Sequence, residues 1–443
     1  MKRIFSSVLL AAGVSLAAAQ VQVSVHPDNQ WVWHAPETPV VRIVAKDAAL
    51  KAVSAEITLV VTTDTQTPVC ELAQSVRIAA GDSAVLTFKP SVTVPGIYKC
   101  RVMADGANAL DFPFLQYAGT AKASHFNIAF EPENIVSLPD HQPDFEAFWN
   151  ESRRELAQVE PHYEMTELKE KSSRFKRFYL VRMLSLGGDT IQAYLTIPTK
   201  ASKPHRSPYL GEQAQGRQYP VHIVYMGYDS GVWDLDTGDN GWIQLLVSVR
   251  GQALNKPTNK YGDWIRHGLQ SPQTYYYRGA YMDCVRAIDF VCTLPEADKS
   301  RIYAEGGSQG GAFTTAAAAL DHRLAAVAPY ITFMSDFPDY FRIVDWPARP
   351  IFEQQHALGL SDGEMYRTMS YFDIKNLARW VECPVFLGIG LQDPTCPPHT
   401  NLSGYNLMNV AKRLTVYPRH GHHVDYSHWN AAVIDWFDHY RRE

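Results

Sequence analysis

The chain has 443 residues, of which 46% are hydrophobic and 20% are charged. This length and apolar content suffice for one large domain or for two to three ordinary ones, and they exclude disorder, a coiled coil and a collagen-like fibre. With 41 basic and 46 acidic residues the formal net charge is −5, so we expect neither a nucleic-acid-binding surface nor attraction to anionic lipid.

Residues 1–19 have the pattern of a cleavable secretory signal. Lys2 and Arg3 form a basic start, an apolar stretch follows from Ile4 to Leu16, and three alanines occupy positions 17–19. The apolar stretch is too short for a membrane span, and cleavage would remove two positive charges and change the net charge from −5 to −7. We therefore expect a secreted or periplasmic protein with no membrane partner.

The next segment has the pattern of an all-β domain. Between Val21 and about Tyr117, short alternating apolar runs are separated by Gly, Pro, Asp and Asn, as in Ile97–Val102 after a Pro-Gly turn. Such spacing is typical of a β-sandwich. We place an Ig-like sandwich at residues 20–125 and a second domain at residues 126–443.

The six cysteines are too few for a disulfide scaffold, and the sequence holds no C-x-x-C pair that would indicate a zinc ribbon or a thioredoxin-type centre. Cys70 and Cys100 could form a disulfide in an oxidising compartment, or they could be two buried thiols. The sequence alone leaves both interpretations open.

From residue 126 onward, buried-looking strands alternate with helical stretches. The runs 178–185 and 190–197 flank Gly187-Gly188-Asp189, which predicts a β-hairpin. Further short apolar runs follow at Val221–Tyr225, Trp242–Val249, Arg301–Ala304, Leu324–Val327, Val385–Ile389 and Leu414–Tyr417. Such alternation predicts an α/β domain whose mostly parallel sheet has helices on both faces.

A glycine-rich turn carries a candidate nucleophile. The sequence GGSQGG at 306–311 lies between the strand run ending at Ala304 and the Ala-rich helix 312–320. In a nucleophile elbow the serine, here Ser308, occupies a strained strand-to-helix turn, and the glycines around it avoid collisions. The alternative is a purely structural glycine turn. The string is neither G-x-G-x-x-G nor a P-loop, so it predicts no dinucleotide or nucleotide cofactor.

A serine hydroxyl needs an imidazole to take its proton and a carboxylate to orient that imidazole. After a nucleophile elbow these partners follow in the order acid, then His. Asp393 directly follows the strand run 385–391, and His422 follows the run 414–417. The sequence therefore predicts a triad of Ser308, Asp393 and His422.

Other residues compete for these roles. Asp336, Asp345 and Asp425 are acids in less favourable places, and Asp393 could instead be an Asx-turn residue before proline. The sequence HGHH at 420–423 could bind zinc together with Asp425, but no helical H-E-x-x-H and no further ligand set accompany it, so we expect no metal. Spacing alone leaves open which of the three histidines is the base.

The oxyanion of a tetrahedral intermediate needs two preorganised N–H donors. One is the amide of the residue after the nucleophile, Gln309. The other should come from the loop after an early strand, and the sequence MGYD at 226–229, directly after 221–225, makes the Tyr228 amide the candidate. The alternative is a plain tight turn with an aromatic cap.

Several motifs together resemble those of a known enzyme family. They are Arg250-Gly251-Gln252, the GGSQGG elbow, the sequence GLQDPTCPP at 390–398, Tyr276-Tyr277-Arg278-Gly279 and Arg286-Ala287. This set, which runs from about Asp144 to the C-terminus, is similar to that of the acetyl xylan esterase and cephalosporin C deacetylase family, carbohydrate esterase family seven.

The resemblance implies an α/β-hydrolase fold, acetylated xylo-oligosaccharides and related small acetyl esters as substrates, and no cofactor. It also implies Ser308, Asp393 and His422 as the catalytic triad, with Tyr228 and Gln309 supplying the oxyanion hole. Family members often form closed homohexamers, an assembly that the N-terminal sandwich could change or block.

Three positions depart from the family pattern. Met226 stands where the family usually has His, Ser248 where it has an acid before Val-Arg-Gly-Gln, and His423 where it has Glu. None of them removes a triad member, but they bear on the support of the site and on its pH optimum. Arg250 resembles a structural ion-pair residue of the family rather than a catalytic one.

We therefore predict a secreted serine carbohydrate esterase that removes acetyl groups through an acyl-enzyme, with an acetylated carbohydrate as its partner. The alternatives are an esterase or peptidase for another acyl group, and a catalytically idle carbohydrate-binding protein. Activity should rise as the base loses its proton, near the unperturbed histidine pKa of ~6.5.

Overall fold

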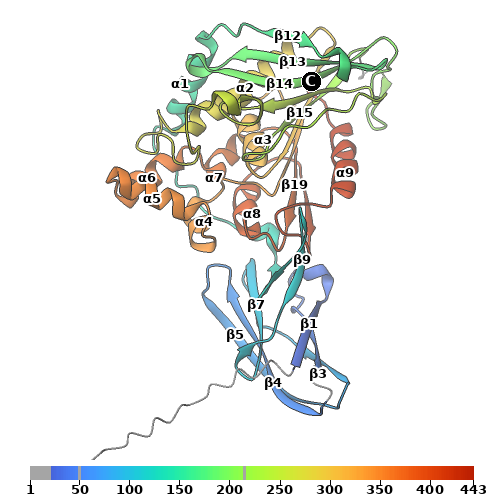
Figure 1. The fold of residues 1–443 in the computed structure, drawn as a ribbon, viewed down its shortest axis with the longest axis vertical. Coiled ribbons are helices and arrows are strands. Elements are labelled where there is room, and N and C mark those ends of the chain that lie inside the picture. The colour runs from blue at the N-terminus through green and yellow to red at the C-terminus, as the bar shows by residue number, and fades with distance from the viewer. Residues whose placement is uncertain (1–20, 48–50, 213–215) are drawn as a thin grey trace, which may run out of the picture.

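The computed structural model describes residues 21–47, 51–212 and 216–443. They form a smaller β-rich N-terminal body and a larger α/β body that includes the C-terminus (Figure 1). The secretory signal predicted at 1–19 lies outside the described residues. No helix in the described part of the chain has both the length and the hydropathy needed to cross a membrane.

Mostly antiparallel strands build the N-terminal body. One sheet has the order β1-β3-β6, a second has the order β2-β11-β7-β4-β5 with β8 beside β7, and β9 pairs with β10. The strands are β1 (Val21–Pro27), β2 (Val32–Trp33), β3 (Val41–Asp47), β4 (Val53–Thr63), β5 (Pro68–Ile78), β6 (Ser83–Phe88), β7 (Gly96–Ala104), β8 (Ala107–Asn108), β9 (Phe112–Gln116), β10 (Gly119–Ala123) and β11 (Phe126–Phe130). Buried and exposed residues alternate along β3, as a half-buried strand requires. The predicted β-sandwich is confirmed.

The last strand of this body, β11, lies just past the boundary expected near residue 125. It pairs with β7 and β2, so it belongs to the N-terminal sheet. All five of its residues are buried. Its continuous run therefore lacks the alternation that marked the other strands in the sequence.

The two cysteines that could have formed a disulfide lie on β5 and β7, the two neighbours of β4. Val61 of β4 pairs with Cys70 on one side and with Cys100 on the other. Two strand spacings separate the Cα atoms of these cysteines, about 9–10 Å, which is more than the ~7 Å that a disulfide spans between Cα atoms. Both thiols are free.

A nine-stranded sheet forms the centre of the larger body. Its order is β12-β13-β14-β16-β15-β17-β18-β19-β20; the first three strands and β16 pair antiparallel, and all pairs from β16 to β20 are parallel. The strands are β12 (Glu164–Glu167), β13 (Lys176–Leu184), β14 (Thr190–Pro198), β15 (Tyr219–Tyr225), β16 (Ile243–Ser248), β17 (Ala297–Gly307), β18 (Ala326–Tyr330), β19 (Val385–Gly390) and β20 (Lys412–Tyr417). This order confirms the mostly parallel sheet and contains the predicted hairpin as β13–β14.

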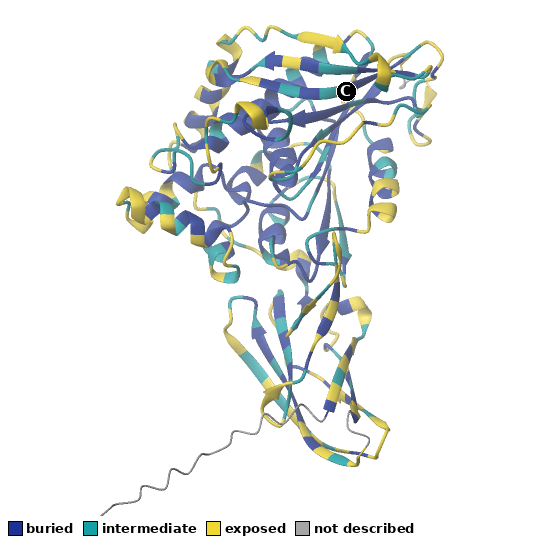
Figure 2. Ribbon diagram, in the orientation of Figure 1, coloured by how far each residue is buried: buried dark blue, intermediate teal, exposed yellow. Residues whose placement is uncertain are grey.

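Helices cover both faces of this sheet (Figure 1). They are α1 (Phe145–Gln158), α2 (Tyr276–Thr293), α3 (Gln309–Leu320), α4 (Phe337–Ile343), α5 (Ala348–Leu358), α6 (Asp362–Ser370), α7 (Ile374–Leu377), α8 (Pro398–Asn406) and α9 (Tyr426–Asp438). Every residue of α3 is buried, whereas α5 and α6 expose much of their surface (Figure 2). On the face covered by α9, the Trp429 ring stacks on Phe386 of β19 at 4.6 Å between centroids.

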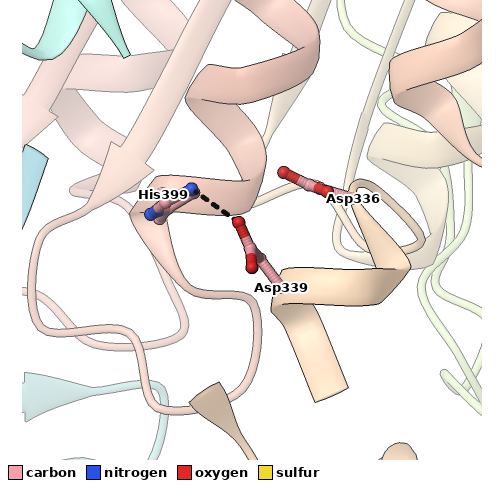
Figure 3. Close-up of side chains that lie close together, drawn as sticks. All are labelled: Asp336, Asp339 and His399. Carbon is pink, nitrogen blue, oxygen red and sulfur yellow. Dashed lines mark ion pairs between the residues drawn. The ribbon is translucent and has the colours of Figure 1, made fainter. Parts of the chain in front are cut away.

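Buried charges link the two bodies. His399 of α8 lies 2.9 Å from the Asp64 carboxylate of the N-terminal body. On its other side, it lies 3.5 Å from Asp339 of α4 (Figure 3). Burial alone would lower the pKa of His399, but the two carboxylates outweigh it and raise the pKa to about 10. The neighbouring Asp336 pairs with the Lys375 ammonium at 3.0 Å. Asp336, Asp339 and His399 are close enough together to ligate a metal. However, Asp336 already pairs with Lys375 and Asp339 with His399, so we interpret the cluster as an ion-pair network.

Candidate active site

Ser308 occupies a strained turn between β17 and α3. Its backbone has φ 57° and ψ −121°, a conformation that a residue with a Cβ rarely adopts. The Ser308 N–H donates to the carbonyl of Tyr330 at the end of β18, and the Ser308 carbonyl accepts from the N–H of Phe333. These two bonds hold the turn at the carboxyl edge of the sheet, where the nucleophile of an elbow belongs.

The glycine at 310 lets this turn pack against the neighbouring strand. A Cβ at Gly310 would lie 2.1 Å from the carbonyl oxygen of Tyr225 on β15, well inside van der Waals contact. Any side chain there would push α3 off the sheet and move Ser308 with it. The glycine-rich sequence thus has the steric role that the sequence pattern predicted.

The structure brings the three predicted triad residues together. Nε2 of His422 lies 3.0 Å from Oγ of Ser308, and Nδ1 of His422 lies 2.8 Å from Oδ2 of Asp393. Loops at the ends of three different strands supply them: Ser308 follows β17, Asp393 follows β19 and His422 follows β20. Both distances are within the range of good hydrogen bonds.

The Asp393 carboxylate is fixed from two sides. Its Oδ1 accepts hydrogen bonds from the backbone N–H groups of Thr395 and Cys396, at 2.8 and 2.9 Å, while Oδ2 meets the imidazole. Its side chain is 0% exposed. A carboxylate held in this way keeps the proton of His422 on Nδ1, which leaves Nε2 free to accept one.

The same carboxylate shifts the titration of the imidazole. Burial alone would lower the pKa of His422, but the Asp393 carboxylate and the Cys396 thiol outweigh burial and hold the pKa well above its ordinary value of 6.5. The expectation of an unperturbed pKa is therefore revised upward. The sequence could not anticipate this shift, because it depends on how the fold brings Asp393 and Cys396 against the imidazole.

This shift leads to a prediction for the pH profile. An imidazole with a raised pKa stays protonated to higher pH, and only its neutral form can accept the serine proton. We therefore expect kcat/KM for a small acetyl ester to reach half of its maximum above pH 6.5 and to be low at pH 5. A profile measured from pH 5 to 9 in constant ionic strength checks this, and a curve that is flat between pH 5 and 8 contradicts it.

The predicted oxyanion-hole residues meet beside the elbow. The loop carrying Tyr228 packs against the elbow, since a Cβ on Gly227 would lie 3.7 Å from the carbonyl of Gly307. Gln309 is the first residue of α3, so its N–H has no partner within the helix. Among the described residues, no acceptor is recorded for the backbone N–H of Tyr228 or of Gln309. Both N–H groups are thus without an acceptor in the described structure, as the donors of an oxyanion hole must be.

An amide network lies behind these two donors. The side chains of Gln252 and Gln309 hydrogen-bond reciprocally at 3.0 and 3.1 Å, and the Tyr277 hydroxyl donates to Gln309 Oε1 at 2.9 Å. Gln252 Oε1 also accepts from the backbone N–H of Asp229, next to Tyr228. Sequence reasoning did not assign this role to Gln252 or Tyr277, although both lie in motifs that carried the family resemblance.

Arg250 lies deeper, in a buried ion-pair network. Its guanidinium donates to both oxygens of Asp283, at 2.9 and 2.6 Å, and to Asp189 at 2.9 Å. The Asp283 side chain is 0% exposed. Arg250 contacts none of the triad residues in the hydrogen bonds of the described structure, in keeping with the structural role implied by the resemblance.

The competing acids are engaged elsewhere. Asp336 pairs with Lys375, and Asp345, which precedes α5, pairs with Arg349 at the start of that helix. Asp425 caps α9 through the N–H groups of Ser427 and His428. The HGHH sequence does not form a metal-ligand group within the described residues. The rings of His420 and His423 instead lie 4.7 Å apart, and burial lowers the pKa of both.

Two of the three departures from the family pattern lie in contact. The Ser248 hydroxyl lies 3.6 Å from the sulfur of Met226. Both residues are buried. This chain therefore has a neutral contact at the two positions where the family pattern has His and an acid.

The chain matches a family model described as acetyl xylan esterase (AXE1) over residues 136–440. It is 26% identical over 315 residues to the acetyl esterase Axe7A of Xylanibacter ruminicola, a match that covers 67% of each chain. Its fold is similar to that of an acetyl xylan esterase from Paenibacillus sp. R4, with 27% identity and a TM-score of 0.61 over 70% of this chain and 98% of that one.

A second solved structure, acetyl xylan esterase 1 from Thermoanaerobacterium sp. JW/SL YS485, is 24% identical with a TM-score of 0.60 and covers 70% of this chain and 97% of its own. These matches confirm the α/β-hydrolase fold and the resemblance drawn from the motifs. The protein is accordingly a carboxylic ester hydrolase with acetyl esterase activity. The chain belongs to the acetyl xylan esterase (AXE1) family.

Proposed function

We propose that this protein is a secreted serine esterase that removes acetyl groups from acetylated xylo-oligosaccharides or similar small acetylated carbohydrates. The observation that carries the proposal is the chain of hydrogen bonds from Asp393 through His422 to Ser308 at a strained elbow. A structural glycine turn would need neither the imidazole nor the buried carboxylate.

In the first half-reaction Ser308 Oγ attacks the acetyl carbonyl while His422 Nε2 accepts its proton. The amides of Tyr228 and Gln309 hydrogen-bond to the oxyanion of the tetrahedral intermediate. The bond from the carbonyl carbon to the sugar oxygen then breaks, and the imidazolium gives its proton to that oxygen. The sugar leaves with a free hydroxyl, and the acetyl group remains on Ser308.

In the second half-reaction a water molecule takes the place of the sugar. His422 accepts a proton from this water as its oxygen attacks the acetyl carbonyl, and the same two amides hold the oxyanion. Collapse of the intermediate releases acetate, and the imidazolium returns the proton to Ser308 Oγ. No cofactor is needed for either half.

Aromatic side chains beside the elbow favour a short acyl group. The Phe333 N–H donates to the Ser308 carbonyl, and the Phe333 ring stacks on Trp346 at 5.4 Å between centroids. The Tyr228 ring lies 5.6 Å from the same Trp346 ring. We propose that these three rings form an aromatic wall that limits the length of the acyl chain. The same wall would lie along the apolar face of the sugar.

The acyl series tests this proposal. Acetate release from acetylated xylo-oligosaccharides should be readily measurable, and kcat/KM should fall at least tenfold from acetyl to butyryl esters of one alcohol, because added methylenes meet the aromatic wall. Acid quenching during turnover should trap one acetyl group on the peptide that contains Ser308. If kcat/KM is the same for acetyl and butyryl esters, the protein is an esterase of another class. If the trapped acetyl group is found on a residue other than Ser308, the serine mechanism is overturned.

The export of the protein, its domain limits and its assembly belong to the same proposal. The pattern at 1–19 supports a cleaved signal and a secreted or periplasmic protein. The strand order supports an N-terminal sandwich that continues from the predicted limit of residue 125 to the end of β11 at Phe130. We propose that the protein forms a homo-oligomer, and that the N-terminal sandwich restricts which of the family's assemblies it can adopt.

A further inference from the structure

The N-terminal body contacts the active-site loops directly. Strand β9 pairs with β10 along one edge, and its other edge binds the loop after β20. There the Leu115 N–H donates to the carbonyl of Arg419, and the Leu115 carbonyl accepts from the N–H of Gly421, both at 2.7 Å. The loop that carries His422 is thus held to the hairpin of the other body by an isolated parallel β-bridge between Leu115 and His420.

Gln116, the last residue of β9, reaches His422 itself. Its side-chain oxygen accepts a hydrogen bond from the backbone N–H of His422 at 2.9 Å. The fit is close, since a Cβ on Gly421 would lie 2.7 Å from both the Gln116 amide and the Phe114 ring. Because the His422 backbone is held in this way, the position of its Cβ is fixed, and the imidazole ring stays within hydrogen-bonding distance of both Ser308 and Asp393.

A second contact holds the loop that carries Asp393. The Asn127 side chain of β11 donates to the carbonyl of Leu391 at 2.9 Å. Gln392 in turn accepts from the Asn127 N–H at 2.7 Å and donates to the carbonyls of Asn127 and Pro418. Asn127, Leu391 and Gln392 are all buried, so these bonds are shielded from water. Gln392 also ties the Asp393 loop to the loop before His422.

This support is additional to the family's catalytic unit. The family match begins at residue 136, after the end of β11. The match to the Paenibacillus esterase covers 98% of that chain with 70% of this one, so about 30% of this chain has almost no counterpart there. In this chain, by contrast, residues before 136 bond to both loops that carry the acid and the base.

We propose that the N-terminal sandwich is a positioning domain for the catalytic loops, and that Gln116 is the positioning residue that fixes His422. The proposal rests on the proposed function, since it assigns a role in the Ser308–Asp393–His422 mechanism. It also gives the sandwich a task other than carbohydrate binding. Gln116 acts through the backbone of His422.

The test uses two full-length variants at the same position. Gln116→Ala removes the acceptor, so the imidazole should lose its fixed place: kcat for a small aryl acetate should fall about 10- to 100-fold with KM changed less than twofold. The contact between the imidazole and Asp393 should loosen as well. The acid limb of the pH profile, where kcat/KM falls toward low pH, should then have its half-maximum about half a pH unit closer to the ordinary histidine pKa of 6.5.

Gln116→Glu keeps the acceptor and adds a negative charge. It should retain kcat within about threefold and move the acid limb about half a pH unit upward, opposite to Gln116→Ala. The titratable groups that face the imidazole are Asp393, Cys396 and His423, and neither variant alters them. The added charge of Gln116→Glu moves the acid limb whether or not Gln116 positions His422. The discriminating result is therefore the downward shift of the acid limb in Gln116→Ala at nearly unchanged KM, which a merely structural role would not give.

Thr120→Ala provides the matched control, because Thr120 is exposed and pairs with Leu115 on the same hairpin. It should leave kcat, KM and the pH profile unchanged. Two results would overturn the positioning role. One is a kcat and a pH profile of Gln116→Ala equal to those of wild type, and the other is a loss of kcat in Thr120→Ala equal to that in Gln116→Ala. Should Gln116→Ala fail to fold, Gln116→Leu, which keeps most of the side-chain volume without the acceptor, takes its place with the same expected loss of kcat and the same downward shift of the acid limb. Failure of the proposed function differs from all of these, since wild type itself would then release no acetate.

Discussion

Replacing Ser308 by alanine is expected to lower kcat/KM for an acetyl ester by about 10⁴- to 10⁶-fold. The reason is geometric, since Ser308 supplies the hydroxyl that lies 3.0 Å from Nε2 of His422. Without that oxygen no acyl-enzyme can form there, and only water positioned by the imidazole and the two amides remains as a nucleophile. Acetate release by the full-length protein, measured over hours at high enzyme concentration, gives the residual rate.

The Ser308→Ala variant should fold normally. Alanine carries the same Cβ as serine and meets the same positive φ, so the strain at this position is unchanged. The backbone bonds of residue 308 to Tyr330 and Phe333 do not involve the hydroxyl. Its thermal unfolding midpoint should lie within a few degrees of wild type, which separates loss of chemistry from loss of structure.

A rival nucleophile provides the control for this prediction. The Cys396 thiol interacts with the same imidazole and lies 3.6 Å from the hydroxyl of Tyr340. If the serine is the nucleophile, Cys396→Ala should retain more than a tenth of wild-type kcat, and thiol reagents should spare the enzyme. Activity that survives in Ser308→Ala but is abolished in Cys396→Ala would reject the serine mechanism.

The parts of the site that could be predicted are those encoded locally. The elbow depends on one strand, one turn and one helix within about 25 residues, and its glycines are required by contacts such as that of Gly310 with Tyr225. Asp393 and His422 each directly follow a clear strand run, so the edge of the sheet to which they belong could be inferred. Their meeting with Ser308 follows from a parallel order that the alternation of strands and helices already indicated.

The parts that could not be predicted arise from contacts distant in sequence. Asn127 and Gln392 are separated by 265 positions, and neither lies in a pattern that predicts its partner. Gln116 ends an ordinary-looking strand, so its bond to His422 has no local signal. The raised pKa of His422 likewise depends on the tertiary contacts that bring Asp393 and Cys396 to its ring.

The acid of the triad leads to the second large effect. Asp393→Asn should lower kcat by about 10⁴-fold with little change in KM for a small ester. An asparagine oxygen can still accept from the N–H groups of Thr395 and Cys396, so the loop should keep its shape. Its NH₂ group would then face Nδ1 of His422 and would require that nitrogen to be an acceptor. The imidazole proton would move to Nε2, and that nitrogen could no longer accept the proton of Ser308.

Asp425→Asn is the matched control for this change. Asp425 is also a carboxylate close to the histidine loop, but it caps α9, and asparagine is an equally good N-cap. It should therefore retain kcat within about threefold. A second readout follows from the charge: the Asp393 carboxylate is the largest of the groups that raise the pKa of His422, so without it this pKa should fall and the weak residual activity should persist to lower pH than in wild type. Retention of more than a tenth of kcat in Asp393→Asn would remove Asp393 from the triad and transfer its role to another acid.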